Sequence, residues 1–434
     1  MPKLDTPRMR IADVDKTRIV IIGGGFAGLE VAKGLRHADV QTVLIDKYNH
    51  HCFQPLLYQV ATSALETSSI VAPFRKLLSK QRDFYFRLGE VISIKSEENC
   101  IETSIGSLKY DYLVIANGAG TNFYGMKDVE SNAYPMKTIT DAIKLRNVII
   151  RNFEAALLTD DPVTMNSLID FVIVGGGPTG VELAGALAEL KNHVFPKDYP
   201  ELEVDNMDIH LVEATPRLLN GMSDVAGRKA QEYLEKMGVH VHLNIAVKSY
   251  DGNTVTLSSG ETLISRTMIW AAGVTGLPIG GISADAFGKA KRIKVDSYNR
   301  MIGTNNIFAV GDAAIMDSDL SFPHGHPQMA QPAMQQGRLV AKNISRIIKN
   351  QSLKEFHYFD KGSMATIGRN RAVADLKGLK VTGFLAWLMW MFIHLISLIG
   401  FKNKFFVFSS WVFSYFSYDK SNRLIIARPK DGIN

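Results

Sequence analysis

The sequence predicts an α/β protein with two Rossmann-like domains and a separate helical segment at its C-terminal end. Three features predict this fold class: a glycine-rich turn near residue 25, a second such turn near residue 177, and an aromatic, basic stretch after residue 380. Each turn stands between a β-branched run and a helical pattern, which is the order of strand, tight turn and helix. With 434 residues, the chain is long enough for two or three cores.

The composition indicates a globular protein. Hydrophobic residues make up 46% and charged residues 21% of the chain, which excludes a disordered protein. Two cysteines do not provide a disulfide framework, so a reducing compartment is expected. Residues 1–16 contain no apolar core segment, and no signal peptide is expected.

The first glycine turn, RIVIIGGGFAGLEVAKGL, spaces Gly23, Gly25 and Gly28 as in a dinucleotide-binding turn. Glycines there allow a tight turn and the close approach of a pyrophosphate to the positive end of the helix dipole. Asp46 follows eighteen residues after Gly28, near the spacing expected of an acid that binds a ribose. A purely structural turn is the alternative. Three neighbouring residues are assigned to the same site: Phe26, Ala27 and Lys47.

The second turn, DFVIVGGGPTGVELAGALAEL, repeats the pattern with Gly175, Gly177 and Gly180. Its candidate acid, Glu213, follows only after thirty-three residues, because we interpret KNHVFPKDYPELEVDN as an inserted loop. An acid at the ribose repels a 2′-phosphate and favours NADH over NADPH, although Arg217 nearby leaves that preference open. A solvated strand end is the alternative interpretation of Glu213.

Further predicted strands end in small residues. YDYLVIANGAG reaches Gly118, TMIWAAGV reaches Gly273, and NNIFAVGDAA ends at Gly311 and Asp312, where a carboxylate can reach the ribityl or pyrophosphate part of a flavin. Taken in order, the five motifs of residues 18–345 resemble the flavoprotein superfamily with two dinucleotide-binding domains. The resemblance implies that FAD binds the first turn and the Asp312 stretch, and that the nicotinamide nucleotide binds the second turn.

Cysteine and histidine usage narrows the chemistry. Disulfide reductases need a cysteine pair shortly after the first turn, but NHHCFQPLLYQVATSAL has only Cys52 there, and Cys100 lies in a polar, hairpin-like segment. Sulfide:quinone reductases likewise need several cysteines, so a thiol relay is not expected and Cys52 is interpreted as a buried or partly buried bystander. No metal is expected either, because four histidines lack accompanying ligands at metal-site spacing: His50, His51, His324 and His326.

Several longer motifs resemble a narrower family, the type II NADH:quinone oxidoreductases. They are HHCFQPLLYQVA, GPTGVELAGALAEL, FPKDYPEL, GHPQMAQPAMQQG, KGSMATIGRNRAV and AWLMWMFIHLISLIGFKNK. The resemblance implies a single-subunit flavoenzyme of respiratory membranes, with non-covalent FAD, that pumps no protons. The expected segments are an FAD-binding domain at 1–150 and 298–380, an NADH-binding domain at 151–297, and membrane-associating helices at 381–434.

The stretch AQPAMQQG places Gln331 and Gln335 four apart, on one face of a predicted helix. A quinone offers two carbonyl acceptors, and a glutamine amide donates to one without burying a charge. By resemblance, this motif lines the quinone pocket beside the flavin, with Lys361 at its border. On spacing alone, solvated glutamines are the alternative. The quinone-site residues are therefore Gln331, Ala333, Met334, Gln335 and Lys361.

Glu182 lies two positions after the last glycine of the second turn. We expect it in the first turn of a helix, where the helix dipole favours a carboxylate, and that interaction alone would account for the residue. The resemblance implies that the family's glutamate helps to hold NADH and communicates with the quinone side. Glu182 is therefore assigned substrate positioning and proton handling.

The excess of positive charge lies in the C-terminal tail. Residues 377–434 contain eight Lys or Arg against two acids, which leaves 41 of each in the rest of the chain. The tail also contains thirteen aromatic residues between Phe384 and Tyr418. GFLAWLMWMFIHLISLIG is close to the lower limit for a membrane span, but we favour a helical pair lying in one leaflet, with basic residues near anionic lipid. A membrane span, a dimer interface and a core helix are the alternatives.

The predicted reaction follows from these parts. NADH binds the second domain, hydride passes to the flavin, and two electrons with two protons reach a quinone near Gln331 and Gln335. The protein is expected on the cytoplasmic face of the cell membrane, as a homodimer, with no nucleic-acid partner. Two alternatives are another FAD and NADH reductase, of the sulfide or ferredoxin type, and an NADH-sensing flavoprotein acting through partner binding. Rapid turnover with a soluble quinone argues against the sensor.

Overall fold

The computed structural model describes residues 9–420 and 422–425, so Arg428 and Lys430 of the basic tail lie outside the described residues. The chain forms two compact units, each built from three stretches. Unit 1 comprises Met1–His51, Ala72–Gly120 and Val274–Asp360, and unit 2 comprises Cys52–Val71, Thr121–Gly273 and Lys361–Asn434. The predicted segment boundaries at 150, 297 and 380 do not coincide with the edges of these units.

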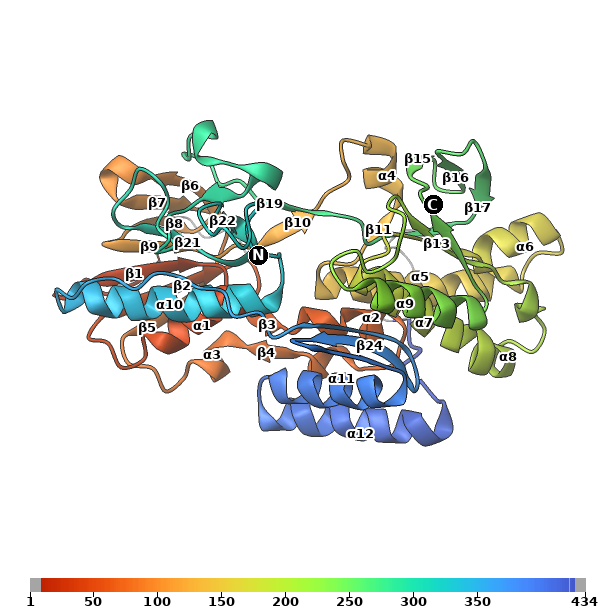
Figure 1. Ribbon diagram of the computed structural model, residues 1–434. Helices are drawn as coiled ribbons and strands as arrows, with labels where there is room; N and C mark the ends of the chain where they lie inside the picture. The colour runs from red at the N-terminus through yellow and green to blue at the C-terminus, as the bar shows by residue number, and fades with distance from the viewer. Residues whose placement is uncertain (1–8, 421, 426–434) are drawn as a thin grey trace. The chain divides into compact units, whose positions relative to one another are not determined.

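A parallel sheet of five strands forms the centre of unit 1 (Figure 1). β1 and β2 are buried along almost their whole length, as expected of β-branched strands covered on both faces. Helices α1 and α10 pack together on one face, and the antiparallel strands β6, β7 and β8 cover the other. The order of the sheet is β21 (Ile307–Ala309), β9 (Tyr112–Ile115), β1 (Arg18–Ile22), β2 (Gln41–Asp46) and β5 (Phe84–Leu88). The covering elements are α1 (Phe26–Gly34), α10 (Ala330–Ile348), β6 (Val91–Lys95), β7 (Cys100–Thr103) and β8 (Gly106–Lys109).

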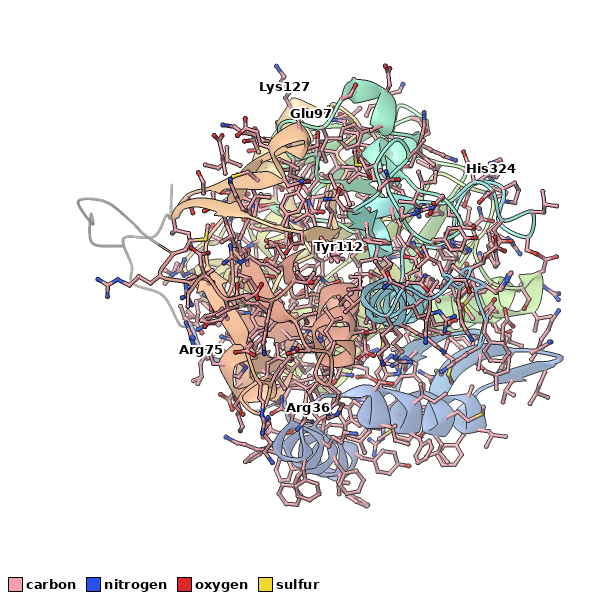
Figure 2. All side chains as sticks on the ribbon, turned by 90° about the vertical axis from the view of Figure 1, so that its left-hand side faces the viewer. Arg36, Arg75, Glu97, Tyr112, Lys127 and His324 are labelled. Atoms are coloured by element: carbon pink, nitrogen blue, oxygen red, sulfur yellow. The ribbon has the colours of Figure 1, made fainter. Side chains whose placement is uncertain are left out.

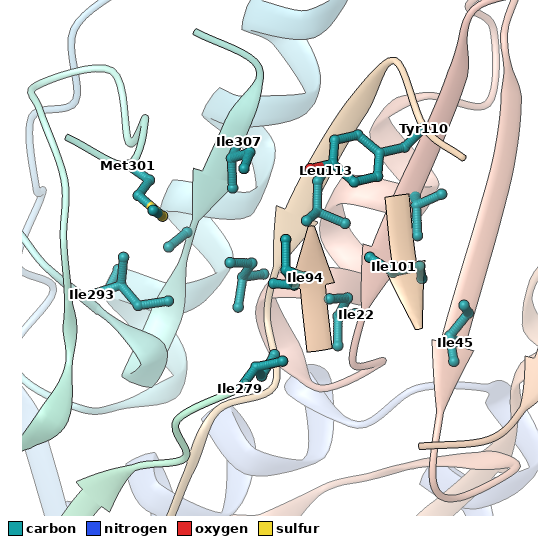
Figure 3. Packing of buried hydrophobic residues seen from close by; sticks show 14 of the residues in the cluster. Ile22, Ile45, Ile94, Ile101, Tyr110, Leu113, Ile279, Ile293, Met301 and Ile307 are labelled. Carbon is teal, nitrogen blue, oxygen red and sulfur yellow. The ribbon is translucent and has the colours of Figure 1, made fainter. Parts of the chain in front are cut away.

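Side chains from the sheet and its covering strands meet in one core (Figure 3). Ile22 and Ile45 of the sheet pack in the same cluster as Ile94 and Ile101 of β6 and β7, and Ile307 of the late strand β21 joins them. This core holds the carboxyl ends of β21, β9, β1 and β2 at one edge of the parallel sheet, which is where ligands bind in open parallel sheets.

Unit 2 repeats this plan around a second parallel sheet of five strands. Helix α7 follows β12 as α1 follows β1, and the antiparallel strands β15, β16 and β17 share a core with one face of the sheet. The sheet order is β11 (Tyr134–Pro135), β18 (Thr267–Trp270), β12 (Phe171–Val174), β13 (Ile209–Glu213) and β14 (Val239–Leu243). The other elements named here are α7 (Pro178–His193), β15 (Val247–Tyr250), β16 (Thr254–Leu257) and β17 (Thr262–Ile264).

Two parts of unit 2 differ from the sequence-based expectation. The segment expected as an inserted loop is partly helical, because α7 continues to His193 and α8 (Phe195–Asp198) follows it. Phe195 is buried with its ring centroid 4.0 Å from that of Phe153, so the segment is packed and the loop prediction is wrong. Helix α5 (Ile139–Ala156) begins at a capping box and packs with α2 (Leu57–Ala61) and α6 (Pro162–Ile169), which explains why residues 121–150 belong to unit 2.

The C-terminal part of unit 2 is a three-stranded antiparallel sheet followed by two helices, α11 (Phe384–Ser397) and α12 (Phe401–Ser417). Ala386 of α11 packs on the buried alanines of β24, while ring-bearing side chains project outward from the helix pair (Figure 2). In the part of the chain that the structure describes, no helix has the length and apolarity needed to cross a membrane. The strands are β23 (Ser363–Gly368), β24 (Arg371–Leu376) and β25 (Leu379–Thr382).

The remaining elements are short, apart from α9 (Asp224–Lys236) of unit 2. Their bounds are β3 (His50–Cys52), β4 (Val71–Pro73), α3 (Phe74–Leu77), β10 (Ala119–Thr121), α4 (Lys127–Asn132), β19 (Val274–Gly276), β20 (Ile293–Lys294) and β22 (Ala314–Ile315).

Candidate active site

The first glycine turn leaves open space at the start of α1. Gly23 has a φ of 93°, and a Cβ there would lie 2.4 Å from the backbone oxygen of Ala116. A Cβ on Gly28 would lie 1.9 Å from the oxygen of Gly23, so α1 packs this closely on the turn only with glycine. Gly25 caps α1 without a side-chain hydrogen bond, and a Cβ there would meet nothing within 4 Å. The start of α1 therefore has room for a ligand beside Gly25.

Asp46, at the end of β2, orders the same turn. Its Oδ2 accepts a hydrogen bond from the N–H of Gly24 at 2.6 Å, and its Oδ1 accepts one from the N–H of Tyr48 at 2.7 Å. Burial raises the pKa of this carboxyl group, and the two hydrogen bonds oppose the rise. The neighbouring Lys47 pairs with Glu90 at the surface.

The Gly311 stretch meets this turn and the glutamine-motif helix. A Cβ on Gly311 would lie 3.1 Å from the Cβ of Ala333 on α10 and 3.3 Å from the Cβ of Ala27 on α1. The N–H of Gly311 donates to Oε1 of the buried Gln336 at 2.7 Å. Unit 1 therefore brings together three motifs that the sequence predicted separately: the first turn, the strand end at Asp312, and the helix of the glutamine motif.

The two predicted quinone-site glutamines differ in their surroundings. Gln335 is bonded to the chain itself, because its Nε2 donates to the oxygen of Phe359 at 2.9 Å and its Oε1 accepts from the N–H of Phe359 at 3.0 Å. Gln331 lies in the first turn of α10, which begins at Ala330. Sequence reasoning missed Gln336; the available signal was its position beside Ala333 and Gly337 on the small-residue side of the motif.

The second glycine turn has the same geometry as the first. Gly175 has a φ of 112°, and a Cβ there would lie 2.8 Å from the backbone nitrogen of Ala272. A Cβ on Gly180 would lie 1.9 Å from the oxygen of Gly175. Gly177 caps α7 without a side-chain hydrogen bond and has nothing within 4 Å of a Cβ position. The start of α7 is thus open in the same way as the start of α1.

Glu213 stands at the end of β13 as Asp46 stands at the end of β2. Its Oε2 accepts from the N–H of Gly176 at 2.5 Å, and its Oε1 accepts from the N–H of Thr215 at 2.8 Å. The guanidinium group of Arg217 is bonded to Asn220 and pairs with Asp224. The acid is therefore part of the turn, and the arginine is held by other partners.

Both turns fit a dinucleotide. An open glycine at each helix N-terminus leaves room for a pyrophosphate, and the helix dipole favours its charge. Gly118 and Gly273 have φ values of 74° and 75°, so the chain turns sharply after the strands that flank the two turns. At Gly118 the Cβ position is open, whereas at Gly273 it would lie 2.2 Å from the hydroxyl oxygen of Tyr124.

Glu182 is buried in the second turn of α7, with 7% of its surface exposed. Its Oε1 accepts from the indole Nε1 of Trp390 at 3.2 Å and from the N–H of Thr366 at 3.4 Å. Burial raises the pKa of Glu182, the two hydrogen bonds oppose the rise, and the resulting pKa is about 8. The prediction that Glu182 lies in the first helical turn, under the influence of the dipole, is wrong, because α7 begins at Pro178. Desolvation has the largest effect on the pKa of Glu182.

An aromatic cavity of about 110 Å³ lies beside Glu182 in unit 2. Three of the chain's four tryptophans line it: Trp387, Trp390 and Trp411. At another part of its wall, the guanidinium group of Arg369 lies 4.1 and 4.0 Å from the ring centroids of Tyr415 and Tyr418. The cavity is therefore walled by rings, with a carboxyl group that titrates near neutral pH on its surface. The predicted pocket residue Lys361 is exposed and is not part of this lining.

Comparison with known proteins identifies the family. Residues 17–337 match the pyridine nucleotide-disulphide oxidoreductase family, and residues 360–417 match the NDH2 C-terminal domain. Two type II NADH:quinone oxidoreductases of Mycobacterium tuberculosis, Ndh and NdhA, are each 37% identical to this chain over 415 residues. The alignments cover 92% of this chain and 88% and 87% of the relatives. The chain belongs to the type II NADH:quinone oxidoreductases.

Solved structures confirm the fold of this type II NADH:quinone oxidoreductase. The structure of NDH2 from Plasmodium falciparum in complex with NADH covers 95% of this chain and all of that chain, with a TM-score of 0.87 and 22% identity. The predicted α/β fold is thereby confirmed, and the 37% identical relatives confirm the family resemblance. The protein is a single-subunit flavoenzyme that transfers electrons from NADH to quinone, with FAD as its cofactor.

The same fold serves a different electron donor in a neighbouring enzyme. Sulfide:quinone oxidoreductase from Aquifex aeolicus has a TM-score of 0.71 and 19% identity, covering 92% of this chain and 95% of that one. In the type II NADH:quinone oxidoreductase, Cys52 and Cys100 are both free thiols. Burial raises the pKa of Cys52 to about 12, which leaves it a poor nucleophile. Within the described residues, no group of three or more potential ligands is placed to hold a metal ion.

Proposed function

We propose that NADH binds the second glycine turn and that electrons leave the protein beside α10 of unit 1. The open start of α7 would hold the NADH pyrophosphate, and the open start of α1, with the Gly311–Asp312 stretch, would hold FAD. FAD, when bound, accepts an electron pair from NADH and passes it to quinone. The protein's own task is to hold the reacting rings and to supply protons.

Glu213 favours NADH over NADPH. Its carboxylate ends β13 next to the open turn, where a 2′-phosphate would meet a negative charge. Arg217 is held by Asn220 and Asp224 and does not offset that charge. In the folded chain, Arg217 therefore does not weaken the preference for NADH that Glu213 provides.

One observation carries the placement of the quinone site: Ala333 of α10 packs against Gly311 and next to Ala27 of the first turn. Small side chains here allow a flat ring to approach the flavin turn, and Gln331 offers an uncharged donor two residues earlier in the same helix. Gln335 has a supporting part, because its two hydrogen bonds order the backbone at Phe359. Glu182 is proposed to handle protons and to position substrate.

The helix pair α11–α12 is proposed to lie on the membrane surface. Large apolar side chains remain exposed along both helices, including Phe392, Ile396, Phe405, Phe413 and Phe416. Lys402 and Lys404 lie in the first turn of α12, where they can meet anionic headgroups. Such a surface keeps the enzyme near a lipid-soluble acceptor on the cytoplasmic face, where NADH is available. The alternative is that a second copy of the chain covers the same surface in a homodimer.

An anaerobic mixing experiment tests the relay. NADH should bleach the yellow flavin absorbance, and a short-chain quinone should then restore it rapidly. Gln331→Ala should slow only the second phase, because it removes a donor at the proposed acceptor site. Bleaching without recovery would contradict the quinone site and favour a protein acceptor or a sensory role.

A further inference from the structure

Trp390 links the outer helix pair to Glu182. It lies on α11, is only 2% exposed, and donates its indole N–H to Oε1 of Glu182 at 3.2 Å. Its ring stacks on His394 with centroids 4.0 Å apart and lies 5.7 Å from the ring of Trp411 on α12. The donor is therefore held by both helices and has little freedom to turn away.

The matching indole of α12 bonds elsewhere. Trp411 donates its N–H to Oε1 of Gln59 at 2.8 Å, and Gln59 in turn donates to the hydroxyl of Tyr58 at 2.9 Å. A buried tryptophan, Trp390, and a partly buried one, Trp411, thus point N–H groups inward from neighbouring helices, but only Trp390 reaches a titratable acid. This difference supplies an internal control.

We propose that Trp390 is a positioning residue for Glu182: its N–H, supplied by the apolar helix α11, keeps the carboxyl group at the cavity wall and favours release of its proton. The inference rests on the proposed proton-handling role of Glu182. A charged acceptor gains more from an N–H donor than a neutral one does, so the hydrogen bond stabilises the carboxylate over the acid.

The other ionisable groups around the cavity do not replace this contact. They are Tyr58 from α2, Glu189 from α7, Arg369 from the β23–β24 turn, His394 from α11, Tyr415 from α12, and Tyr418 and Lys420 beyond the end of α12. Burial lowers the pKa of His394 to about 4 and raises that of Tyr58 well above its usual value, so both are neutral near pH 7. Lys420 lies 3.5 Å from Glu189, and that glutamate also accepts from the N–H of Arg369. In the described part of the chain, no basic side chain forms an ion pair with Glu182.

Infrared titration of the FAD-loaded enzyme tests the contact directly. The C=O stretch of protonated Glu182 is identified as the carboxylic-acid band that Glu182→Gln removes, and its intensity is followed against pH. Trp390→Phe keeps a ring in the cavity wall but removes the donor. We expect the titration midpoint to rise by about one pH unit, the scale of one hydrogen bond to a charged group. Trp411→Phe should leave the midpoint unchanged.

The outcomes separate the two proposals. An unchanged midpoint in Trp390→Phe, or an equal shift in Trp411→Phe, would overturn the positioning role. A shifted midpoint that the pH profile of quinone turnover does not follow would support the contact but contradict the proton-handling role of Glu182. Trp390→Tyr, which restores a donor at the ring edge, should return the midpoint toward that of the parent. If Trp390→Phe does not retain flavin, Trp390→Met, a flexible apolar side chain without a donor, takes its place in the same comparison.

Discussion

Two glutamates occupy the same position in the two glycine motifs and have opposite surroundings. Glu30 and Glu182 each follow the last glycine of their turn by two residues. Glu30 on α1 pairs with Lys33 and with Arg338 of α10. Glu182 on α7 has an indole N–H and a backbone N–H as its donors.

The covering elements cause the difference. Helix α1 is covered by α10, which presents a charged side chain to Glu30, whereas α7 lies against β23 and the apolar helix α11 supplies Trp390. At Gly185 of α7, a Cβ would lie 1.7 Å from the backbone oxygen of Ile367, so this helix and strand are in backbone contact. A shared nucleotide-binding motif therefore fixes the turn, and the element packed on its helix determines the chemistry of the following acid.

The largest expected effect comes from filling the open glycine of either turn. Gly25→Val and Gly177→Val place a side chain where no protein atom lies, so each should fold while blocking its pyrophosphate position. Gly25→Val should be purified without flavin and have background activity. Gly177→Val should retain flavin but show a KM for NADH raised by about 100-fold or more, the scale of losing a helix-terminus anion site together with a steric clash. Flavin absorbance and steady-state kinetics measure both, and the reverse pattern would exchange the two nucleotide assignments.

Neutralising the two glutamates should have unequal consequences. Glu182→Gln should reduce quinone-dependent turnover by about 100-fold, the scale of one general acid or base. Glu30→Gln removes only the charge that pairs with Lys33 and the exposed Arg338, and it should change turnover by less than about twofold. Turnover with a short-chain quinone at saturating NADH is the measurement. Equal losses in the two variants would show that burial does not distinguish the two sites.

Burial of Glu182 should also make the stability of the protein depend on pH. The folded-state pKa of Glu182, about 8, lies above the ordinary glutamate value of 4.5, so the folded protein holds the proton more tightly than the unfolded chain. The resulting stabilisation is fully present below pH 4.5 and is lost as the pH rises to about 8. Relative to the parent, Glu182→Gln should therefore gain free energy of unfolding between pH 5 and 9, by an amount on the order of a few kcal/mol. Thermal unfolding across that range measures the difference, and parallel curves for both proteins would contradict the buried-acid interpretation.

The turns were predictable from sequence because their constraints are local. Gly23 and Gly28 contact each other within one loop, and Asp46 and Glu213 reach their turns from the ends of the next strands along the sheets. Short-range spacing encodes such contacts. The surroundings of Glu182 were not predictable, because its donors Thr366 and Trp390 are 184 and 208 residues away in sequence.

The glutamine motif shows the same limit within one helix. Helical spacing correctly placed Gln331 and Gln335 on α10, but it did not show that Gln335 would be bonded to Phe359, twenty-four residues later. Gln336, which the sequence analysis did not single out, is buried and accepts a hydrogen bond from Gly311. Periodicity gives the face of a helix, whereas the partner on that face depends on the fold.

A smaller effect is expected from replacing Gln336, whose side chain holds the Gly311 stretch beside the first turn. Gln336→Leu leaves the partly buried N–H of Gly311 without its acceptor, which should weaken FAD binding by about tenfold. The KM for NADH of the flavin-saturated variant should be unchanged, because the second turn does not depend on this bond. Flavin dissociation, followed by fluorescence, is the measurement, and Lys342→Leu on the exposed side of the same helix is the matched control. Equal flavin loss in both variants would point to damage to α10 instead.

The smallest effect on chemistry should come from the outer side of α12. Phe413 is 58% exposed, and Phe413→Glu places a charge among side chains proposed to enter the lipid headgroup region. Binding to anionic vesicles should fall by about fivefold, while turnover with a water-soluble quinone stays near that of the parent. Leu158→Glu, at an 87% exposed position after α5, should change neither, which controls for added charge on a lone apolar residue. Vesicle co-sedimentation and light scattering together decide what covers the face: unchanged vesicle binding with a loss of dimer would assign it to a second copy.

Because Trp390 lies on the opposite, buried side of the helix pair, the titration midpoint of Glu182 should be unaffected in Phe413→Glu. A shifted midpoint would instead show that seating of the outer helices controls the acid on α7.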